Sequence, residues 1–237
     1  MVFAGLTGIC LYYLLENVAL TYTLASNISV IVSIAPIFTG ILAHFFLDGE
    51  KLKGSFIIGF LCAIAGIGLI SFGGGAGVAF NPAGDLMAVA AAMIWGIYSI
   101  LSKKIGSLGY DVIQTTRRTF FYGILFMIPA LFFMDFHPRL GELKSAVNLF
   151  NMVYLGLGAS AMCFVTWNCS VRILGAVKTS IYIYMVPVIT IIISIPVLGE
   201  VITPQAAAGT VLTLAGLFIS EGRFDFLRKL NVNSTGE

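Results

Sequence analysis

The stretch APIFTGILAHFFLDGE (residues 35–50) decides the fold, because a similar stretch, VPVITIIISIPVLGE (residues 186–200), follows about 150 residues later. Each carries a proline near the start of an apolar run, Pro36 in the first and Pro187 in the second, and each ends on Gly-Glu. The recurrence predicts an internal repeat. The surrounding sequence indicates what kind of repeat it is.

The composition around these stretches is that of an integral membrane protein. Of the 237 residues, 59% are hydrophobic and 10% are charged, and the mean hydropathy is +1.00. A soluble domain has roughly a quarter of charged residues. Here the apolar runs are about 20 residues long, the length at which an α-helix crosses the hydrocarbon core. The four cysteines lie inside these runs without a CxxC pair, which indicates buried apolar residues and no metal site.

The apolar runs predict an all-α polytopic bundle of about eight membrane-spanning helices. A segment in the lipid core must satisfy its own backbone hydrogen bonds, which favours helices. The predicted spans cover residues 2–22, 25–47, 54–73, 85–102, 118–134, 149–171, 177–198 and 205–220.

Lysine and arginine residues lie almost entirely on one side of these spans. Eleven lie on that side and two, Arg139 and Lys144, lie on the other, which accounts for all 13. Because cytoplasmic loops retain basic residues, the first side is predicted to be cytoplasmic. Both chain ends then lie in the cytoplasm.

The repeat extends beyond the two proline stretches. A shift of 151 residues aligns Asn17 with Asn168, and after a one-residue slip a shift of 150 aligns Gly59 with Gly209. The first three spans therefore correspond to the last three. Corresponding spans are an odd number apart, so the two copies must cross the bilayer in opposite directions. Inverted repeats of this kind are typical of secondary transporters.

These features resemble a known family. The paired proline and Gly-Glu stretches, the polar turn ENVALTYTLAS (16–26) and the segment GDLMAVAAAMIWGIYSILSKK (84–104) are similar to EamA-type members of the drug/metabolite transporter superfamily. The resemblance covers residues 1 to about 221. It implies ten helices in two inverted halves of five, and transport of amino acids, other small metabolites or toxic compounds, often outward.

The first half of this chain departs from that pattern, with three predicted spans against five in the second half. The expected organisation is a truncated first repeat lacking the first two of ten helices (residues 1–73), a Gly-rich linker (74–84), a five-helix second repeat (85–221) and a cytoplasmic tail (222–237).

Glu16 is the only acidic residue well inside a predicted span, on a helical face that it shares with Tyr12 and Tyr13. An ionisable group in the membrane is costly and usually faces a functional cavity. No lysine or arginine lies at similar depth. Glu16 is therefore a candidate for proton coupling or substrate binding, and a structural hydrogen bond to a neighbouring helix is the alternative.

Aromatic and polar side chains in several spans complete the candidate site. The predicted substrate-binding residues are Tyr13, Glu16, Asn17, Trp95, Tyr98, Trp167, Asn168 and Tyr184. Side chains of these types, if they converge, suit a small organic substrate. For each residue taken singly, ordinary helix packing is the alternative interpretation.

Pro36 and Pro187 each remove a helical hydrogen bond and loosen the turn before them. Their symmetric placement predicts paired hinges, with tolerated packing kinks as the alternative. The Gly-Glu pairs are expected to end helices, with glycine in the left-handed cap. Asp85 is expected to cap the span that follows the linker.

The sequence therefore predicts a secondary transporter, an exporter or exchanger of small metabolites that works by alternating access. No catalytic, metal or cofactor motif is found, so an enzyme is not expected. The alternatives are a non-transporting truncated membrane subunit and a nucleotide-sugar-type exchanger of the same superfamily. The expected location is the bacterial inner membrane. The expected partners are a small-molecule substrate, the lipid bilayer and, as one option, a second copy of the chain; no nucleic-acid partner is expected.

Overall fold

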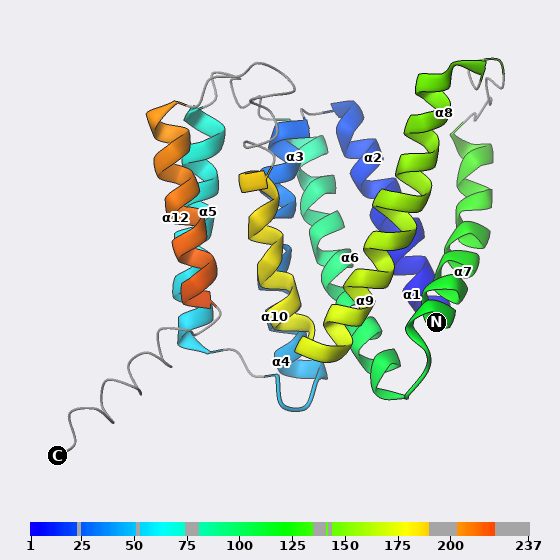
Figure 1. Cartoon of the computed structure of the whole chain (residues 1–237), viewed down its shortest axis with the longest axis horizontal. Coiled ribbons are helices and arrows are strands. Elements are labelled where there is room, and N and C mark those ends of the chain that lie inside the picture. Colours follow the sequence, from blue (N-terminus) through cyan, green and yellow to red (C-terminus); the bar gives the residue numbers. More distant parts are fainter. Residues whose placement is uncertain are drawn as a thin grey trace.

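The computed structural model describes residues 1–22, 25–50, 53–73, 81–134, 141, 144–189 and 203–220, whose regular structure is helical. The elements are α1 (Val2–Gly5), η1 (Leu6–Leu11), α2 (Tyr12–Tyr22), α3 (Ala25–Val32), α4 (Ala35–Phe46), α5 (Gly54–Gly73), α6 (Pro82–Ser107), α7 (Val112–Phe133), α8 (Ala146–Val153), η3 (Tyr154–Met162), α9 (Cys163–Leu174), α10 (Ala176–Ile181), η4 (Tyr182–Tyr184) and α12 (Pro204–Ser220). Figure 1 shows them as rods standing side by side, with α5 and α12 at one edge and α7 and α8 at the other.

The rods have the length and character of membrane spans. Among the described residues, four helical segments are long and apolar enough to cross a membrane: Val2–Tyr22, Ile28–Phe46, Pro82–Ser107 and Ala146–Leu174. Shorter apolar helices cover Gly54–Leu69, Ala176–Ile189 and Ala207–Ser220. Large apolar side chains are exposed on the outside, as on Phe133, which is 90% exposed. The predicted all-α membrane bundle is confirmed.

Helices α6 and α7 begin earlier than the sequence predicts, because polar caps precede their apolar runs. The Asn81 side-chain oxygen accepts hydrogen bonds from the N–H groups of Ala83 and Gly84, so α6 begins at Pro82. Asp85 is therefore not the cap residue as expected; its carboxylate lies in the first turn and accepts a hydrogen bond from the Asn81 N–H. The resulting reciprocal pair resembles a capping box.

The second early start is that of α7. Asp111 accepts a hydrogen bond from the Gln114 N–H at 2.9 Å, and the helix runs from Val112. Arg117 and Arg118 therefore lie within the helix, whereas the predicted span began only at residue 118. The hydrophobic run alone could not locate this start, because residues 114–119 of α7 are polar and separate the first two apolar residues from the run.

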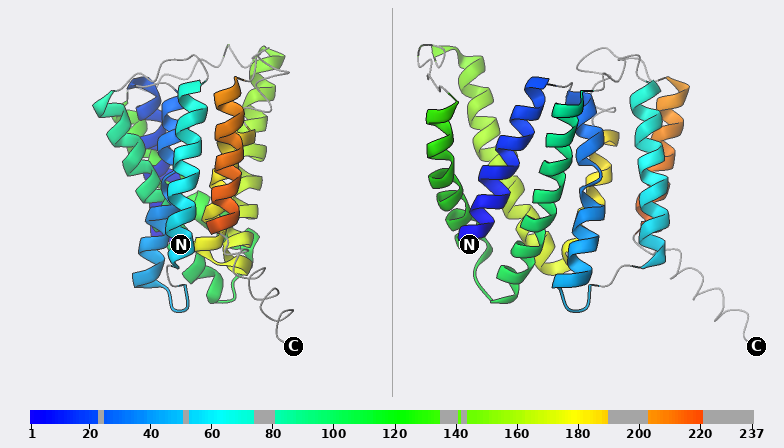
Figure 2. Two further views of the ribbon diagram at one scale, coloured as in Figure 1. Left: turned by 90° about the vertical axis from the view of Figure 1, so that its left-hand side faces the viewer. Right: turned by 180° about the vertical axis from the view of Figure 1, so that it is seen from behind.

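Helices α5 and α12 pack closely against each other in antiparallel directions. Gly59 faces Gly216 and Gly66 faces Gly209, so one helix ascends where the other descends. A Cβ atom added to Gly66 would lie 2.5 Å from the Thr213 backbone nitrogen, closer than real Cβ contacts allow. Small residues permit this approach of the two backbones, as in many membrane helix pairs. Figures 1 and 2 show the pair side by side.

The same pair contains the axis of the internal repeat. The contact of Gly59 with Gly216 becomes the contact of Gly209 with Gly66 when each number is shifted by 150 residues, so the interface maps onto itself. At its centre the Cys62 thiol donates to the Leu212 carbonyl, and these two residues are themselves 150 apart. A contact between such equivalent positions lies at a two-fold axis. The two inverted repeats predicted from the sequence meet here.

The helix that carries each repeat proline is interrupted just before it. The predicted span 25–47 is two helices, because turn residues Ser33 and Ile34 separate α3 from α4, and Pro36 follows as the second residue of α4. In the second repeat the short 3₁₀ segment η4 separates α10 from the helical residues 185–189, which include Pro187. The Gly-Glu pair at 199–200 lies outside the described residues.

Each repeat also contains a π-helical segment at the corresponding place. These are η1 (Leu6–Leu11), which continues into α2, and η3 (Tyr154–Met162), which continues into α9. A shift of 151 residues places η1 within η3. π-helical turns occur often at functional sites and change which face the following helix presents. They therefore orient α2 and α9, the two helices that carry Glu16 and Trp167.

Candidate substrate cavity

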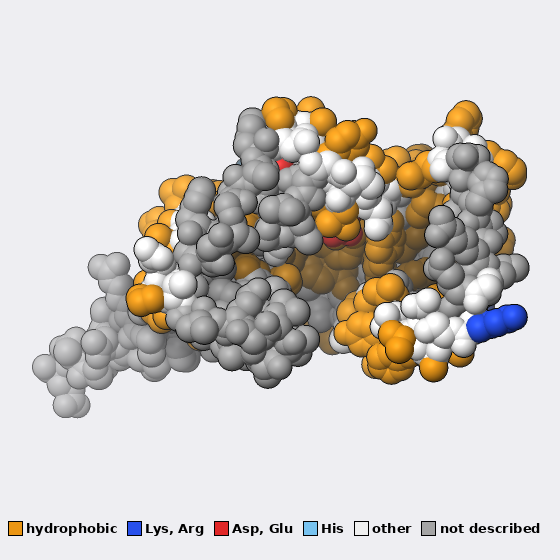
Figure 3. Space-filling view, turned by 90° about the horizontal axis from the view of Figure 1, so that it is seen from above, with side chains coloured by type: hydrophobic (Ala, Val, Ile, Leu, Met, Phe, Trp, Pro, Cys, Tyr) orange, Lys and Arg blue, Asp and Glu red, His pale blue; other side chains and the backbone are white. Residues whose placement is uncertain are grey.

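A cavity of about 390 Å³ lies between the two repeats. From the first repeat, α2 and α3 contribute Tyr12, Glu16, Leu20, Ile28, Ser29 and Val32, and Ser33 follows α3; from the second, Trp95, Trp167, Ile183 and Val186 complete the lining. Figure 3 looks down on the molecule from the upper end of Figure 1 and shows a hollow with mostly hydrophobic walls in which acidic atoms are visible at depth. The volume suits a small organic molecule.

Glu16 has one hydrogen bond in the described part of the chain. The Tyr12 hydroxyl, one helical turn earlier, donates to the Glu16 carboxylate at 3.0 Å. None of the described lining residues is a lysine or an arginine. A carboxyl group in a membrane cavity with no cationic partner is expensive to ionise. The Glu16 carboxylate is therefore a hydrogen-bond acceptor whose negative charge, once formed, is not neutralised by any described lining residue.

Three aromatic rings stand beside this carboxyl group. The ring centroids of Tyr12 and Trp95 are 4.8 Å apart with an interplanar angle of 48°, and those of Trp95 and Trp167 are 5.0 Å apart at 55°. The rings are tilted against one another and all three line the cavity. The indole N–H of Trp167 is buried and has no hydrogen-bond partner among the described residues. Ring carbon, not the indole nitrogen, is therefore what a ligand meets at Trp167.

Asn168 and Tyr98, both predicted site residues, do not line the cavity. Tyr98 and Ser102 donate to the Asn168 side-chain oxygen at 2.7 and 2.6 Å, and the Asn168 amide donates to the Thr116 hydroxyl at 3.0 Å. The group is buried among α6, α7 and α9. We call it the Asn168 node. Its geometry is that of a structural crosslink beneath the cavity.

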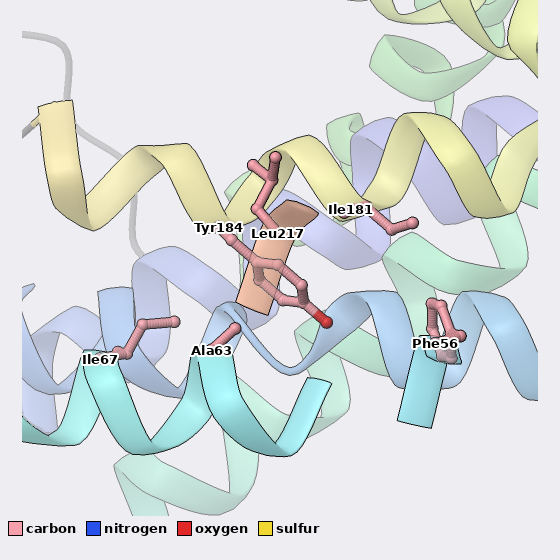
Figure 4. Packing of buried hydrophobic residues seen from close by; sticks show 6 residues of the cluster. All are labelled: Phe56, Ala63, Ile67, Ile181, Tyr184 and Leu217. Carbon is pink, nitrogen blue, oxygen red and sulfur yellow. The ribbon is translucent and has the colours of Figure 1, made fainter. Parts of the chain in front are cut away.

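The other predicted residues also lie away from the cavity wall. Tyr13 turns toward η3, where its hydroxyl lies 3.2 Å from that of Ser160. Asn17 is exposed and donates to the Tyr13 carbonyl of its own helix. Tyr184 is fully buried in a cluster with residues of α5, α10 and α12, and its hydroxyl has no hydrogen-bond partner in the part of the chain that the structure describes. Figure 4 shows Tyr184 among Ala63, Ile67 and Leu217.

Below the cavity the bundle is closed by close packing. Ala43, Ile100, Val171 and Ala176 form a buried cluster to which Trp167 also belongs, so the Trp167 ring is shared between the cavity wall and this floor. Gly96 lies against the α4 backbone, since a Cβ atom there would be 3.1 Å from the Thr39 nitrogen. The cavity therefore lies toward the upper end of the bundle as drawn in Figure 1.

Glu50 ties the two repeats together at the lower end. Its carboxylate accepts hydrogen bonds from the backbone N–H groups of Ala176 at 3.0 Å and Val177 at 2.9 Å, at the start of α10. Gly49 has a positive φ of +87°, but it lies in the turn after α4, whose C-cap is the extended residue Leu47 and not the glycine that was expected to end the helix. Gly175 also needs glycine, because its φ is +97° and a Cβ atom would lie 2.7 Å from the carboxylate. Glu50 thus caps a helix of the other repeat, which the sequence prediction did not include.

Sequence reasoning missed several lining residues, Tyr12 above all. Both Tyr12 and Tyr13 share a helical face with Glu16, and only the rotation of α2 after η1 decides which tyrosine faces the cavity. Ser29 and Ser33 recur four residues apart on the second span, a signal that could have identified them. Among the described residues, no group of three or more potential ligands could hold a metal ion.

Comparisons with known proteins agree with this architecture. The model of the EamA-like transporter family matches residues 1–72 and 82–221. A probable terminal-alkyne amino-acid exporter of Streptantibioticus cattleyicolor is 30% identical over 92% of this chain and 71% of its own length. An uncharacterized transporter of Archaeoglobus fulgidus is 26% identical over 92% of this chain and 74% of its own. A crystal structure with 22% identity superposes with a TM-score of 0.72 over 92% of this chain and 74% of that one, which shows a common fold.

Proposed function

Because the chain belongs to the EamA-like transporter family, we propose that it is a secondary transporter that exports or exchanges a small metabolite, such as an amino acid or a drug-like organic compound, by alternating access. The observation that carries the proposal is the cavity of about 390 Å³, whose lining comes from both repeats. A site between inverted repeats near the middle of the membrane is the place where secondary transporters bind substrate.

The packing supports a specific state in the transport cycle. The floor cluster and the Glu50 cap close the lower end, while the cavity lies toward the upper end. Described lysine and arginine residues gather at the lower end, among them Lys53, Lys103, Lys104, Arg172 and Lys178, and favour its assignment to the cytoplasm. In this proposal both termini are cytoplasmic, the protein resides in the bacterial inner membrane, and the state described has its cytoplasmic side closed.

The interruptions before Pro36 and Pro187 support the proposed hinges. Each separates an upper from a lower half-helix, so the halves can tilt without breaking a continuous hydrogen-bond ladder. The units that move are residues 1–73 and 85–221, joined by the linker 74–84 and followed by the tail 222–237. Proton coupling, if it drives the cycle, is assigned to Glu16, the acidic residue that lines the cavity.

The proposal is tested by flux through liposomes. The full chain is reconstituted in liposomes loaded with a mixture of amino acids and organic amines, and the effluent is assayed by mass spectrometry. We expect selective efflux of at least one solute. A Ser29→Trp variant, which fills the cavity, should abolish this efflux, whereas Leu61→Trp, which places the same side chain on a surface position of α5 that is 62% exposed, should not.

The liposome assay also separates the proposal from its main alternative. If the chain inserts and folds but no solute leaves faster than from empty liposomes, a non-transporting membrane subunit is the better account. If efflux occurs equally in the Ser29→Trp variant, the cavity is not the substrate site and the proposal fails in its structural part.

A further inference from the structure

The cavity contains one acidic side chain and no described counter-charge. Its polar lining consists of Glu16, the Tyr12 hydroxyl that donates to it, and the hydroxyl groups of Ser29 and Ser33. The Ser33 hydroxyl is already used, because it donates to the Ser29 carbonyl at 2.7 Å. The Glu16 carboxylate is therefore the strongest site of interaction that the cavity presents to a ligand.

The carboxylate lies next to an aromatic wall that suits a cation. An ammonium group is attracted to an aromatic face when it lies within about 6 Å of the ring centroid. The neighbouring rings of Tyr12, Trp95 and Trp167 are in contact, with successive centroid distances of 4.8 and 5.0 Å, so a group that lies beside them in the cavity is near more than one ring. Tilted aromatic rings around a carboxylate are the arrangement by which proteins hold organic ammonium ions.

The remaining wall is apolar. Leu20, Ile28, Val32, Ile183 and Val186 surround the polar end. A molecule that fills the cavity therefore needs an apolar body as well as its charged end. A ligand carboxylate would meet no lysine or arginine in the described lining, and two negative charges beside each other, its own and that of an ionised Glu16, would repel.

We infer that the cavity selects a small organic cation, an amine or quaternary ammonium compound with an apolar body, whose charged group is held between Glu16 and the rings of Tyr12, Trp95 and Trp167. The inference rests on the proposed function, since it names the substrate class of the same cavity. The inference predicts that an amine binds more tightly than the amino acid that carries the same side chain. The carboxylate of the amino acid finds no partner in the described lining.

Ligand binding to the purified full chain tests the inference without transport. Stabilisation against heat measures affinity, because a ligand bound to the folded state raises the melting temperature by mass action. The probes are 2-phenylethylamine, its neutral analogue 2-phenylethanol and its amino acid phenylalanine. We expect the amine to bind at least about tenfold more tightly than either of the others, a difference of about 1.4 kcal/mol.

The Glu16→Gln variant should lose this preference, so that amine and alcohol bind alike. Asp48→Asn removes a negative charge at an exposed position outside the cavity, and this variant should keep the preference for the amine. If Glu16→Gln does not fold, Trp95→Leu serves instead, and it should weaken binding of the amine more than that of the alcohol. Equal binding of all three probes to the wild-type chain would overturn the inference, as would an unchanged preference in Glu16→Gln.

The two proposals fail in different ways. Amine-selective binding without flux of any solute contradicts the transporter and leaves the ligand class standing. Flux of acids or neutral compounds, with no preference for the amine in binding, contradicts the ligand class and leaves the transporter standing.

Discussion

Asn168 joins three helices through one side-chain amide. Its oxygen accepts from Tyr98 and Ser102, and its nitrogen donates to Thr116, all inside the bundle. Its repeat counterpart, Asn17, is exposed and bonds only the Tyr13 carbonyl of its own helix. Equivalent positions of the repeat therefore carry the same residue in different environments. The sequence register predicted their equivalence but could not predict which of them is buried.

Replacing Asn168 by alanine should destabilise the protein, because it leaves the buried hydroxyl groups of the Asn168 node without their partner. Each unsatisfied buried group costs about 1–3 kcal/mol, and about 1 kcal/mol lowers the melting temperature of a chain of this size by roughly 2–4 °C. The check is thermal unfolding in detergent. Asn17→Ala is the matched control and should melt close to the wild type; similar melting of both variants would show that the node contributes little.

At the scale of the helices, the contact between α5 and α12 depends on residues without side chains. A Cβ atom on Gly66 would lie 2.5 Å from the Thr213 nitrogen and 2.6 Å from the Gly209 oxygen, whereas a Cβ atom on Gly68 of the same helix would have no atom of the described residues within 4 Å. The sequence register aligns Gly66 with Gly216 of the other repeat, whereas in the structure Gly66 contacts Gly209. The contact between Gly66 and Gly209 follows only when α5 and α12 run in opposite directions, which the odd number of spans between the repeats implies.

Gly66→Ala and Gly68→Ala should therefore change the free energy of unfolding in opposite directions. The first forces two backbones apart and should destabilise the protein by about 1–3 kcal/mol, the usual cost of overpacking. The second should stabilise it by up to about 1 kcal/mol, because alanine is the better helix former. Melting temperatures of the two variants in one detergent decide the matter, and equal destabilisation by both would contradict the interface.

The break between α3 and α4, just before Pro36, can also be tested by mutation. With alanine at position 36, an N–H group becomes available for the Val32 carbonyl, so α3 and α4 can join into one continuous helix. We expect Pro36→Ala to slow efflux from liposomes without lowering the melting temperature. Pro82→Ala is the control, since proline in the first turn of α6 removes no helical hydrogen bond. Unchanged efflux in Pro36→Ala would remove the hinge.

At the scale of the whole molecule, much of the architecture could be read from the sequence and much of the site could not. Apolar runs set the number of spans, and proline, glycine and Gly-Glu pairs in register set the repeat. Of the eight predicted binding residues, Glu16, Trp95 and Trp167 line the cavity. The other five do not line it. For Tyr13, Asn17 and Asn168 the facing of α2 and α9 follows from the π-helical segments η1 and η3, which no periodicity in the sequence indicates.

The Glu50 cap belongs to this scale because it joins one repeat to the other. Glu50→Ala removes the acceptor of the Ala176 and Val177 N–H groups, and hydrogen bonds to charged groups are worth about 1.5–3 kcal/mol each. Amide hydrogen exchange of these two residues should then accelerate by about tenfold or more. Asp48→Ala, two residues earlier and exposed, should leave the exchange unchanged. Slow exchange in both variants would mean that the cap does not hold the lower end of the bundle.

The central claim is that two similar sets of helices cross the membrane in opposite senses around a common cavity. Single cysteines at Lys53, just before α5, and at Thr203, just before α12, test it most directly in a chain whose four native cysteines are replaced by alanine. A membrane-impermeant maleimide should label the cysteine at position 53 only from the cytoplasmic side and the cysteine at position 203 only from the opposite side. Labelling of both from one side would contradict the account.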